Sequence, residues 1–284
     1  MSKKSEQEQP LTGGNVSAVS RAGDTVRREQ TPDSPRIHRL LVHLEKKEYP
    51  ASPRFLGIDP QNREILSYLD GEAGNYPLKA YMWSEAVLAE TARLLRQFHD
   101  ATADFEVPAS WEPLDNTPLP YTVICHNDFA VYNVIFKDKK PIGVIDFDLA
   151  APGPRIWDIA YTLYTFVPLS RLHHDEHGRQ VDYDPVTGPD RIKRRIDIFL
   201  TAYGMPELKE QLFDTLLLRI EALLLTIHRK AADGEEAFQR MIEEGHVTHY
   251  VQELAFIKQH GMTWFDEERG NGANEDGNRY HPNV

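Results

Sequence analysis

Residues 125–161 read CHNDFAVYNVIFKDKKPIGVIDFDLAAPGPRIWDIAY. Two runs in this stretch, Val134–Phe136 and Ile142–Ile145, consist mostly of β-branched and apolar residues, which favour strands. The residues between them, KDKKP, are charged and end in proline, so they predict the turn of a β-hairpin. Polar residues set in apolar sequence flank this hairpin on both sides.

The order of three of these polar residues indicates a site. Asp128 lies five residues before Asn133, and Asp146 follows the hairpin. This order can bring two metal ligands and one free carboxylate to the same end of two neighbouring strands. Phosphoryl transfer needs such a set, because Mg²⁺ and the positioning of the reactants stabilise its charged transition state. Carboxylate and amide oxygens are ligands that suit Mg²⁺.

The N-terminal part of the chain predicts a small antiparallel sheet with one helix. Short runs of alternating β-branched residues are separated by turn residues, and a Ser-Pro pair opens a stretch with leucines on one face. The predicted order is strand, strand, helix, strand, strand, at residues 16–20, 25–28, 34–47, 54–58 and 64–69. We expect this lobe to span residues 11–70.

After Gly71 the sequence changes to long amphipathic patterns typical of helices. The predicted helices span residues 84–103, 154–166, 189–203, 206–232 and 235–260, and one strand pair, the hairpin, is expected among them. Residues 171–188 are rich in His, Asp, Gly and Pro and predict a long loop. We expect the second lobe to span residues 71–266, with polar, disordered tails at 1–10 and 267–284.

The motifs HNDFAVYN, IDFD and WDIA resemble the signature of the aminoglycoside phosphotransferase and choline kinase-like family. The resemblance implies an α+β, protein kinase-like two-lobed fold, with a small antiparallel-sheet lobe and a larger, mainly helical lobe. It also implies transfer of the γ-phosphoryl group of ATP or GTP to a hydroxyl of a small molecule, an antibiotic or a metabolite, with Mg²⁺.

The resemblance assigns roles to individual residues of the central motifs. Asp128 would be the catalytic base that orients the acceptor hydroxyl. Asp158 would brace the catalytic loop, and His126 would pack beneath that loop. The metal site would be held or lined by Asn133, Asp146 and Asp148.

In the N-terminal lobe the resemblance implies a nucleotide site. Its contacts would come from Gly13, Gly14, Arg28, Tyr68 and Leu69. The glycines would form the turn over the phosphates, since glycine lets backbone N–H groups approach oxygens. Arg28 aligns with the strand lysine of the family, and arginine keeps the charge but offers a planar fork. The helix predicted at residues 34–47 shows no glutamate where the family's ion-pair partner would lie.

Composition excludes several classes of protein. The formal net charge of −12 disfavours a nucleic-acid partner, because such proteins usually present a basic face. The single cysteine, Cys125, excludes an intramolecular disulfide, and no stretch approaches the roughly 18 apolar residues of a membrane span. We therefore expect a cytoplasmic protein with no membrane partner, and the sequence does not decide its oligomeric state.

Other polar groups have two interpretations each. His173, His174 and His177 are either a metal patch or part of a solvated loop, and the loop is favoured. Acidic residues of the C-terminal helices either meet a cationic acceptor, such as an aminoglycoside or a choline-like amine, or form a solvated face. The aromatic set near the last motif is assigned to the core: Trp157, Tyr161, Tyr164 and Phe166.

A different class of function is an alternative to the enzyme. A kinase-shaped module that binds a nucleotide or a protein partner without phosphoryl transfer would serve as an immunity or regulatory protein. The short glycine turn and the absent helical glutamate favour this alternative, and the complete set of Asp128, Asn133 and Asp146 opposes it. Hydrolase motifs of the H-E-x-x-H and G-x-S-x-G types are absent from the sequence, and the helix predicted soon after Asp146 leaves little room for a protein kinase's activation loop.

Overall fold

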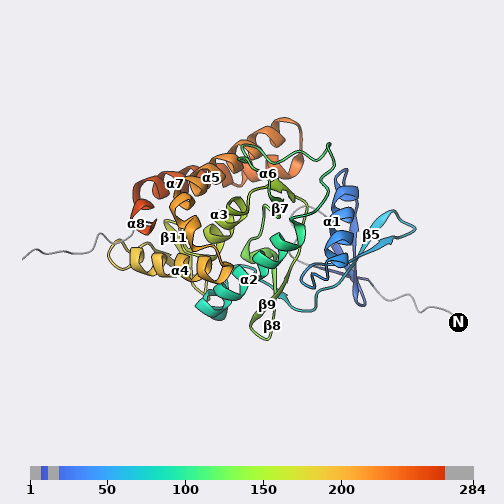
Figure 1. Ribbon diagram of the computed structural model, residues 1–284, viewed down its shortest axis with the longest axis horizontal. Helices are drawn as coiled ribbons and strands as arrows, with labels where there is room; N and C mark the ends of the chain where they lie inside the picture. The colour runs from blue at the N-terminus through green and yellow to red at the C-terminus, as the bar shows by residue number, and fades with distance from the viewer. Residues whose placement is uncertain (1–7, 12–18, 266–284) are drawn as a thin grey trace, which may run out of the picture.

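A five-stranded antiparallel sheet forms one end of the protein in the computed structural model, which describes residues 8–11 and 19–265 (Figure 1). Its strand order is β1-β2-β3-β5-β4. The strands are β1 (Gln9–Pro10), β2 (Val19–Ala22), β3 (Thr25–Glu29), β4 (Phe55–Ile58) and β5 (Arg63–Ser67). The predicted strands are present, although residues 16–18 lie outside the described residues. β1 differs from the prediction, because Gln9 and Pro10 pair with β2 instead of belonging to a loose tail.

Helix α1 (Ser34–Lys46) connects the two hairpins and lies beside the sheet (Figure 1). Ile37, Leu40, Leu41 and Leu44 are all buried, so the apolar stripe expected from the sequence forms part of the core. The structure thus has the strand, strand, helix, strand, strand order that the N-terminal sequence predicts.

The larger part of the protein is mainly helical and forms a second lobe (Figure 1). Helix α2 packs against α4, and α3 packs against α5. The helices are α2 (Glu85–Thr102), α3 (Arg155–Phe166), α4 (Gly188–Tyr203), α5 (Lys209–Ala232), α6 (Glu236–Glu243), α7 (His246–His260) and α8 (Met262–Phe265). Among the residues described, none of these helices has both the length and the apolar character needed to cross a membrane.

The prediction of one helix over residues 235–260 is wrong. Gly245 has φ of 85°, a left-handed conformation that ends α6 and turns the chain into α7. Glycine adopts this conformation without the steric cost of a Cβ atom. The amphipathic pattern continues on both sides of the break, so periodicity alone could not locate it.

The helical lobe contains more strands than predicted. The expected hairpin is present as β8 (Val134–Lys137) and β9 (Lys140–Val144), and β6 (Glu72–Ala73) extends it. The unpredicted pairs are β7 (Val123–Cys125) with β10 (Ala151–Gly153), and β11 (Leu172–His174) with β12 (Gln180–Asp182). The prediction of one strand pair, and of a plain loop at 171–188, is therefore wrong. Strands of two or three residues are too short to show an alternating pattern.

At Gly143, the β8–β9 hairpin packs against two segments of the strand lobe. The backbone N–H of Val144 donates to the carbonyl of Ala51 at 2.8 Å. A Cβ atom at residue 143 would lie 2.9 Å from the Ala51 carbonyl oxygen and 2.8 Å from Leu69 Cδ1. The contact between the hairpin and the segments around Ala51 and Leu69 therefore requires glycine at this position.

Replacing Gly143 by alanine should lower the free energy of unfolding by about 1–3 kcal/mol, because the added methyl group overpacks a rigid backbone contact. Urea unfolding of Gly143→Ala beside wild type would measure the change. Lys140→Ala, at an exposed position of the same strand, is the control and should stay within about 0.5 kcal/mol. Equal stability of the Gly143 variant and the control would contradict the close approach.

Candidate active site between the lobes

Asp128, Asn133 and Tyr132 form one hydrogen-bonded group. Strand β7 ends at Cys125, and the 3₁₀ turn Val131–Asn133 brings Asn133 back towards Asp128. The side-chain amide of Asn133 donates to the backbone oxygen of Asp128 at 3.0 Å and to its Oδ2 at 2.8 Å. The Tyr132 hydroxyl donates to Asp128 Oδ1 at 2.6 Å. The two carboxylate oxygens are thereby held in a fixed orientation.

The hairpin brings Asp146 to the same place. The backbone N–H of Ile145 donates to the carbonyl of Asn133 at 2.9 Å, which joins the exit of β9 to the entrance of β8. Asp146 has φ of 64°, a left-handed conformation that is uncommon for a residue with a side chain. Its side chain is 48% exposed and, together with Asn133 and Asp148, lines a cavity of about 350 Å³. The ordered set predicted from the sequence is thus gathered in space.

Burial and mutual repulsion set the charge state of these carboxyl groups. Burial, followed by the negative charge of Asp146, raises the pKa of Asp128 to about 7, although the hydrogen bonds from Tyr132 and Asn133 act in the opposite direction. The pKa of Asp146 is also raised, first by loss of hydration and then by Asp148, against the effect of Arg28. The charged forms of Asp128 and Asp146 are therefore less favoured here than those of carboxyl groups in water.

The donor set fits Mg²⁺. Because the Asn133 amide nitrogen donates to Asp128, the amide oxygen is the atom of this group available to a cation. The Asp146 carboxylate opens into the same cavity, and an excess of carboxylates over cations surrounds it. Hard oxygen ligands with several positions left for water and phosphate are the usual Mg²⁺ environment.

Arg28 belongs to β3 in the strand lobe. It contacts the carboxylates of Asp146 and Asp148, which belong to the helical lobe. Its Nη2 is 2.8 Å from Asp148 Oδ1, its Nη1 is 3.1 Å from Asp148 Oδ2, and its Nη1 is 3.7 Å from Asp146 Oδ1. Asp148, which we expected to line the metal site, therefore has both oxygens on Arg28. The guanidinium joins the sheet to the segment that follows β9.

Sequence reasoning missed the second partner of Arg28. No helical glutamate reaches this guanidinium among the described residues; instead Glu64 of β5 accepts a hydrogen bond from Arg28 Nε at 2.5 Å. His38 of α1 lies 2.6 Å from the other oxygen of Glu64. The ion-pair partner is thus present, but a strand carries it. Pairing Arg28 with Glu64 in register between β3 and β5 was the signal that could have found it.

The predicted nucleotide contacts fall into two groups. Gly13 and Gly14 lie outside the described residues. Tyr68 and Leu69 line the same cavity as Asn133 and Asp146, and apolar residues of the sheet and α1 complete its wall: Val26, Ile37, Leu41 and Leu66. Arg21 lies 3.8 Å from the centroid of the Tyr68 ring, so a cation–π contact fixes this tyrosine.

Asp158 fixes the loop that carries Asp128. Its carboxylate is fully buried and accepts the backbone N–H groups of His126 at 2.6 Å and of Asn127 at 2.7 Å. His99 Nε2 lies 3.0 Å from the same carboxylate. Burial acts to raise the pKa of Asp158, but His99 and these hydrogen bonds outweigh it and the pKa is lowered.

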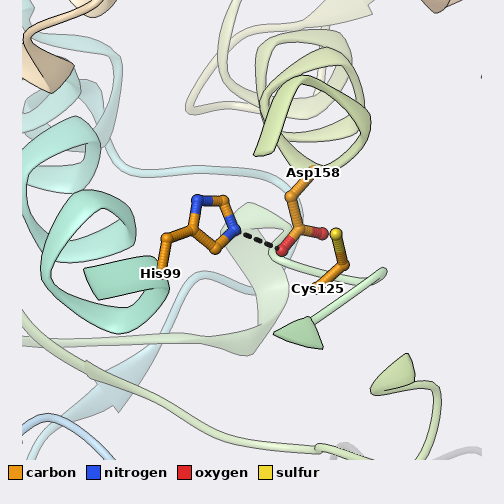
Figure 2. Close-up of side chains that lie close together, drawn as sticks. All are labelled: His99, Cys125 and Asp158. Carbon is orange, nitrogen blue, oxygen red and sulfur yellow. Dashed lines mark hydrogen bonds and ion pairs between the residues drawn. The ribbon is translucent and has the colours of Figure 1, made fainter. Parts of the chain in front are cut away.

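His99, Asp158 and Cys125 lie close together at this brace, as Figure 2 shows. The group resembles a metal site in residue type, but its polar atoms are already used. Each Asp158 oxygen accepts an N–H, and His99 Nδ1 bonds the Tyr203 hydroxyl at 2.7 Å. Burial raises the pKa of the Cys125 thiol, which disfavours the thiolate that a metal would need. The group is a structural brace.

The other polar groups of the sequence lie away from the cavity. His173 and His174 belong to the β11 strand, and His177 follows them at an exposed position. Acidic residues of α5 and of the turn before α6 form surface ion pairs, Glu221 with Lys258 and Glu235 with Lys230. The aromatic set assigned to the core is largely buried, with Trp157, Tyr161 and Phe166 at 5% exposure or less.

Comparison with known structures shows the type of fold. The fold matches Plasmodium vivax ethanolamine kinase with a TM-score of 0.58 and 14% identity, covering 90% of this chain and 83% of that one. It also matches the aminoglycoside phosphotransferase APH(3'')-Id of Streptomyces rimosus, in complex with ADP and streptomycin, with a TM-score of 0.53 and 16% identity over 78% and 93% of the two chains. The chain therefore has a protein kinase-like, two-lobed fold.

Sequence comparison defines the family. Residues 83–193 match the phosphotransferase enzyme family, APH. Over 201 residues the chain is 30% identical to the trifolitoxin immunity protein of Rhizobium leguminosarum bv. trifolii, covering 69% of this chain and 73% of that protein. The chain belongs to the APH phosphotransferase family.

The buried imidazole of His126 should make the protein less stable in mild acid. Burial lowers the pKa of His126 to about 4, so the unfolded chain takes up a proton near the usual pKa of about 6.5 while the folded chain does not. The stabilisation is present above pH ~6.5 and is lost as the pH falls towards 4; between pH 7 and pH 5 the loss is roughly 2 kcal/mol.

Urea unfolding at pH 7 and pH 5 would measure this loss, with wild type, His126→Asn and the exposed His177→Asn as samples. We expect the pH dependence to shrink in His126→Asn and to remain in His177→Asn. The same pH dependence in all three proteins would show that His126 is not the group responsible.

Proposed function

We propose that the protein transfers the γ-phosphoryl group of a nucleoside triphosphate to a hydroxyl of a small molecule, using Mg²⁺. The observation that carries the proposal is the arrangement of three residues with Arg28. Asn133, which binds the Asp128 carboxylate, lines the same cavity as Asp146, and Arg28 of the sheet lines that cavity and lies 3.7 Å from Asp146. Membership of a phosphotransferase family supports the same reaction class.

Asp128 is the base of the proposed reaction. The acceptor oxygen forms a bond to the γ-phosphorus, the bond from that phosphorus to the β,γ-bridging oxygen breaks, and the acceptor's proton moves to the Asp128 carboxylate. A pKa raised to about 7 keeps this carboxylate a usable proton acceptor near neutral pH. Tyr132 and Asn133 hold the carboxylate by one hydrogen bond to each oxygen, which favours a productive angle towards the acceptor.

Asn133 and Asp146 are the residues that would hold Mg²⁺. The bound ion would supply positive charge to the phosphate oxygens as charge develops on them. Arg28 adds a fixed positive charge on the other side of the cavity. The apolar wall next to Tyr68 and Leu69 suits a nucleotide base, and ATP and GTP both fit this chemistry.

The acceptor is proposed to be a small molecule. Structural neighbours include enzymes in complex with streptomycin and an ethanolamine kinase, and these supply candidate classes, aminoglycosides and amino alcohols, for a first panel. Both classes are cationic, in keeping with the negative net charge of −12. The cytoplasmic location expected from the sequence remains a prediction.

Immunity by binding is the second candidate function. The observation that favours it is the 30% identity to the trifolitoxin immunity protein. In that case the fold would hold a nucleotide or a protein partner without transferring phosphate. An immunity protein could also act by phosphorylation, so the presence of an immunity effect does not separate the two candidates. The two candidates are separated by testing whether the protein's effect depends on Asp128.

Asp128→Asn should lower turnover by at least about 100-fold, because it removes the proton acceptor and leaves the shape of the side chain. Nucleotide consumption would be followed with Mg²⁺ and ATP or GTP against aminoglycosides, amino alcohols and sugars. The control is Asp214→Asn on the exposed surface of α5. Acceptor-stimulated turnover that survives Asp128→Asn would contradict the assigned base; wild-type nucleotide binding with no stimulated turnover would favour the binding function.

Asp146→Asn should weaken divalent-cation binding by at least about tenfold, since it removes a charged ligand from the donor set. Titration of Mn²⁺ into protein saturated with a non-hydrolysable nucleotide would measure the affinity by electron paramagnetic resonance. Asp138→Asn, at the exposed turn of the β8–β9 hairpin, is the matched control. Equal Mn²⁺ affinity in wild type and Asp146→Asn would place the cation elsewhere.

A further inference from the structure

Glu64 is a fully buried carboxylate in the strand lobe, with an exposure of 0%. A buried charge is costly unless it is paired and hydrogen-bonded. Both oxygens of Glu64 are engaged, Oε1 by Arg28 Nε at 2.5 Å and Oε2 by His38 Nε2 at 2.6 Å. The sheet therefore holds this carboxylate at one defined point between α1 and the cavity.

Strand register places Arg28 and Glu64 directly opposite each other. The two residues are partners in the antiparallel pair of β3 and β5. Side chains of directly opposed residues lie about 5 Å apart at their Cβ atoms and on one face of the sheet. The distance between this acid and this base is consequently a property of the sheet, and it does not depend on the position of a helix.

Arg28 binds both carboxylates with three of its five N–H donors. Its Nε faces Glu64, and its two terminal nitrogens face Asp148 at 2.8 and 3.1 Å. A lysine has one charged nitrogen and could not bind both carboxylates in this planar arrangement. The arginine is 12% exposed, so its position is set by these two partners more than by solvent.

His38 connects α1 to the same carboxylate. It is 8% exposed, and its ring stacks on Phe55 of β4 with a centroid distance of 3.8 Å. The stacking fixes the ring plane, and the ring nitrogen then bonds Glu64. The residue of α1 that contacts the buried Glu64 carboxylate is therefore a histidine, His38.

We infer that Glu64 is a positioning residue for the nucleotide phosphates: it holds Arg28 at the wall of the cavity, and His38 fixes Glu64 from α1. In protein kinases the equivalent carboxylate is carried by a movable helix. Here a strand carries it, so Arg28 is pre-organised in the resting protein. This inference rests on the proposed function, since it concerns the phosphates of the transferred group.

The experiment moves the carboxylate from the strand to the helix. Glu64→Gln removes the charge and keeps the shape, and the double variant Glu64→Gln with His38→Glu returns one carboxylate from the α1 side. Asp59→Asn is the matched control, because Asp59 is an acid at the start of the neighbouring β4–β5 turn that pairs with Arg63. Each protein is checked for folding by urea unfolding.

Two readouts separate positioning from general support of the fold. The first is nucleotide affinity without acceptor, measured by titration with a fluorescent ATP analogue. The second is the separate effect on KM for nucleotide, KM for acceptor, and kcat. We expect Glu64→Gln to weaken nucleotide binding by about 10- to 100-fold, the range for loss of a charge-assisted hydrogen bond, and to leave the acceptor KM unchanged. The double variant should regain at least about half of that loss on a logarithmic scale.

Three results would overturn the inference: unchanged nucleotide affinity in Glu64→Gln, an equal loss in Asp59→Asn, or no recovery in the double variant. Wild-type protein that binds nucleotide and never turns over would remove the proposed function alone, because the affinity measurements would still decide the role of Glu64. Wild-type protein that binds no nucleotide would remove both.

Discussion

The buried carboxylate of Asp158 is the constraint on which the site depends. It accepts two successive backbone N–H groups from His126 and Asn127, and Asn127 has φ of 64°. Hydrogen bonds to a charged acceptor contribute about 1.5–3 kcal/mol each, enough to hold a residue in a conformation that costs about 1–3 kcal/mol. Asp128 follows directly, so the position of the proposed base is fixed from beneath the loop by a residue on α3.

A second constraint is electrostatic. Asp146 and Asp148 share one arginine, Arg28, and the pKa values of Asp128 and Asp146 are raised. A protein optimised for stability alone would replace such a group by neutral residues. Excess negative charge next to a cavity is instead what a divalent cation and a phosphate chain with its metal would complete.

The sequence predicted the centre of the fold better than its edges, and the reason is physical. Asp128, Asn133 and Asp146 are joined by a short hairpin, so their proximity follows from local chain geometry. Glu64 was missed because its partner Arg28 lies 36 residues away and is reached through strand register, which no local pattern specifies. The break at Gly245 was missed because the apolar pattern continues across it.

Glu64 also bears on the choice between enzyme and binding module. The absent helical glutamate was a reason to expect an inactive, kinase-shaped protein, and a carboxylate on β5 fills that place at 2.5 Å from Arg28. A module that only binds would gain nothing from a left-handed Asp146 or from a carboxylate at residue 128 whose pKa is about 7. Strained backbone and raised pKa values concentrate where chemistry is performed. A strained residue 146 and a carboxylate with a raised pKa at residue 128 both cost stability. Their presence in one site therefore favours phosphoryl transfer over binding alone.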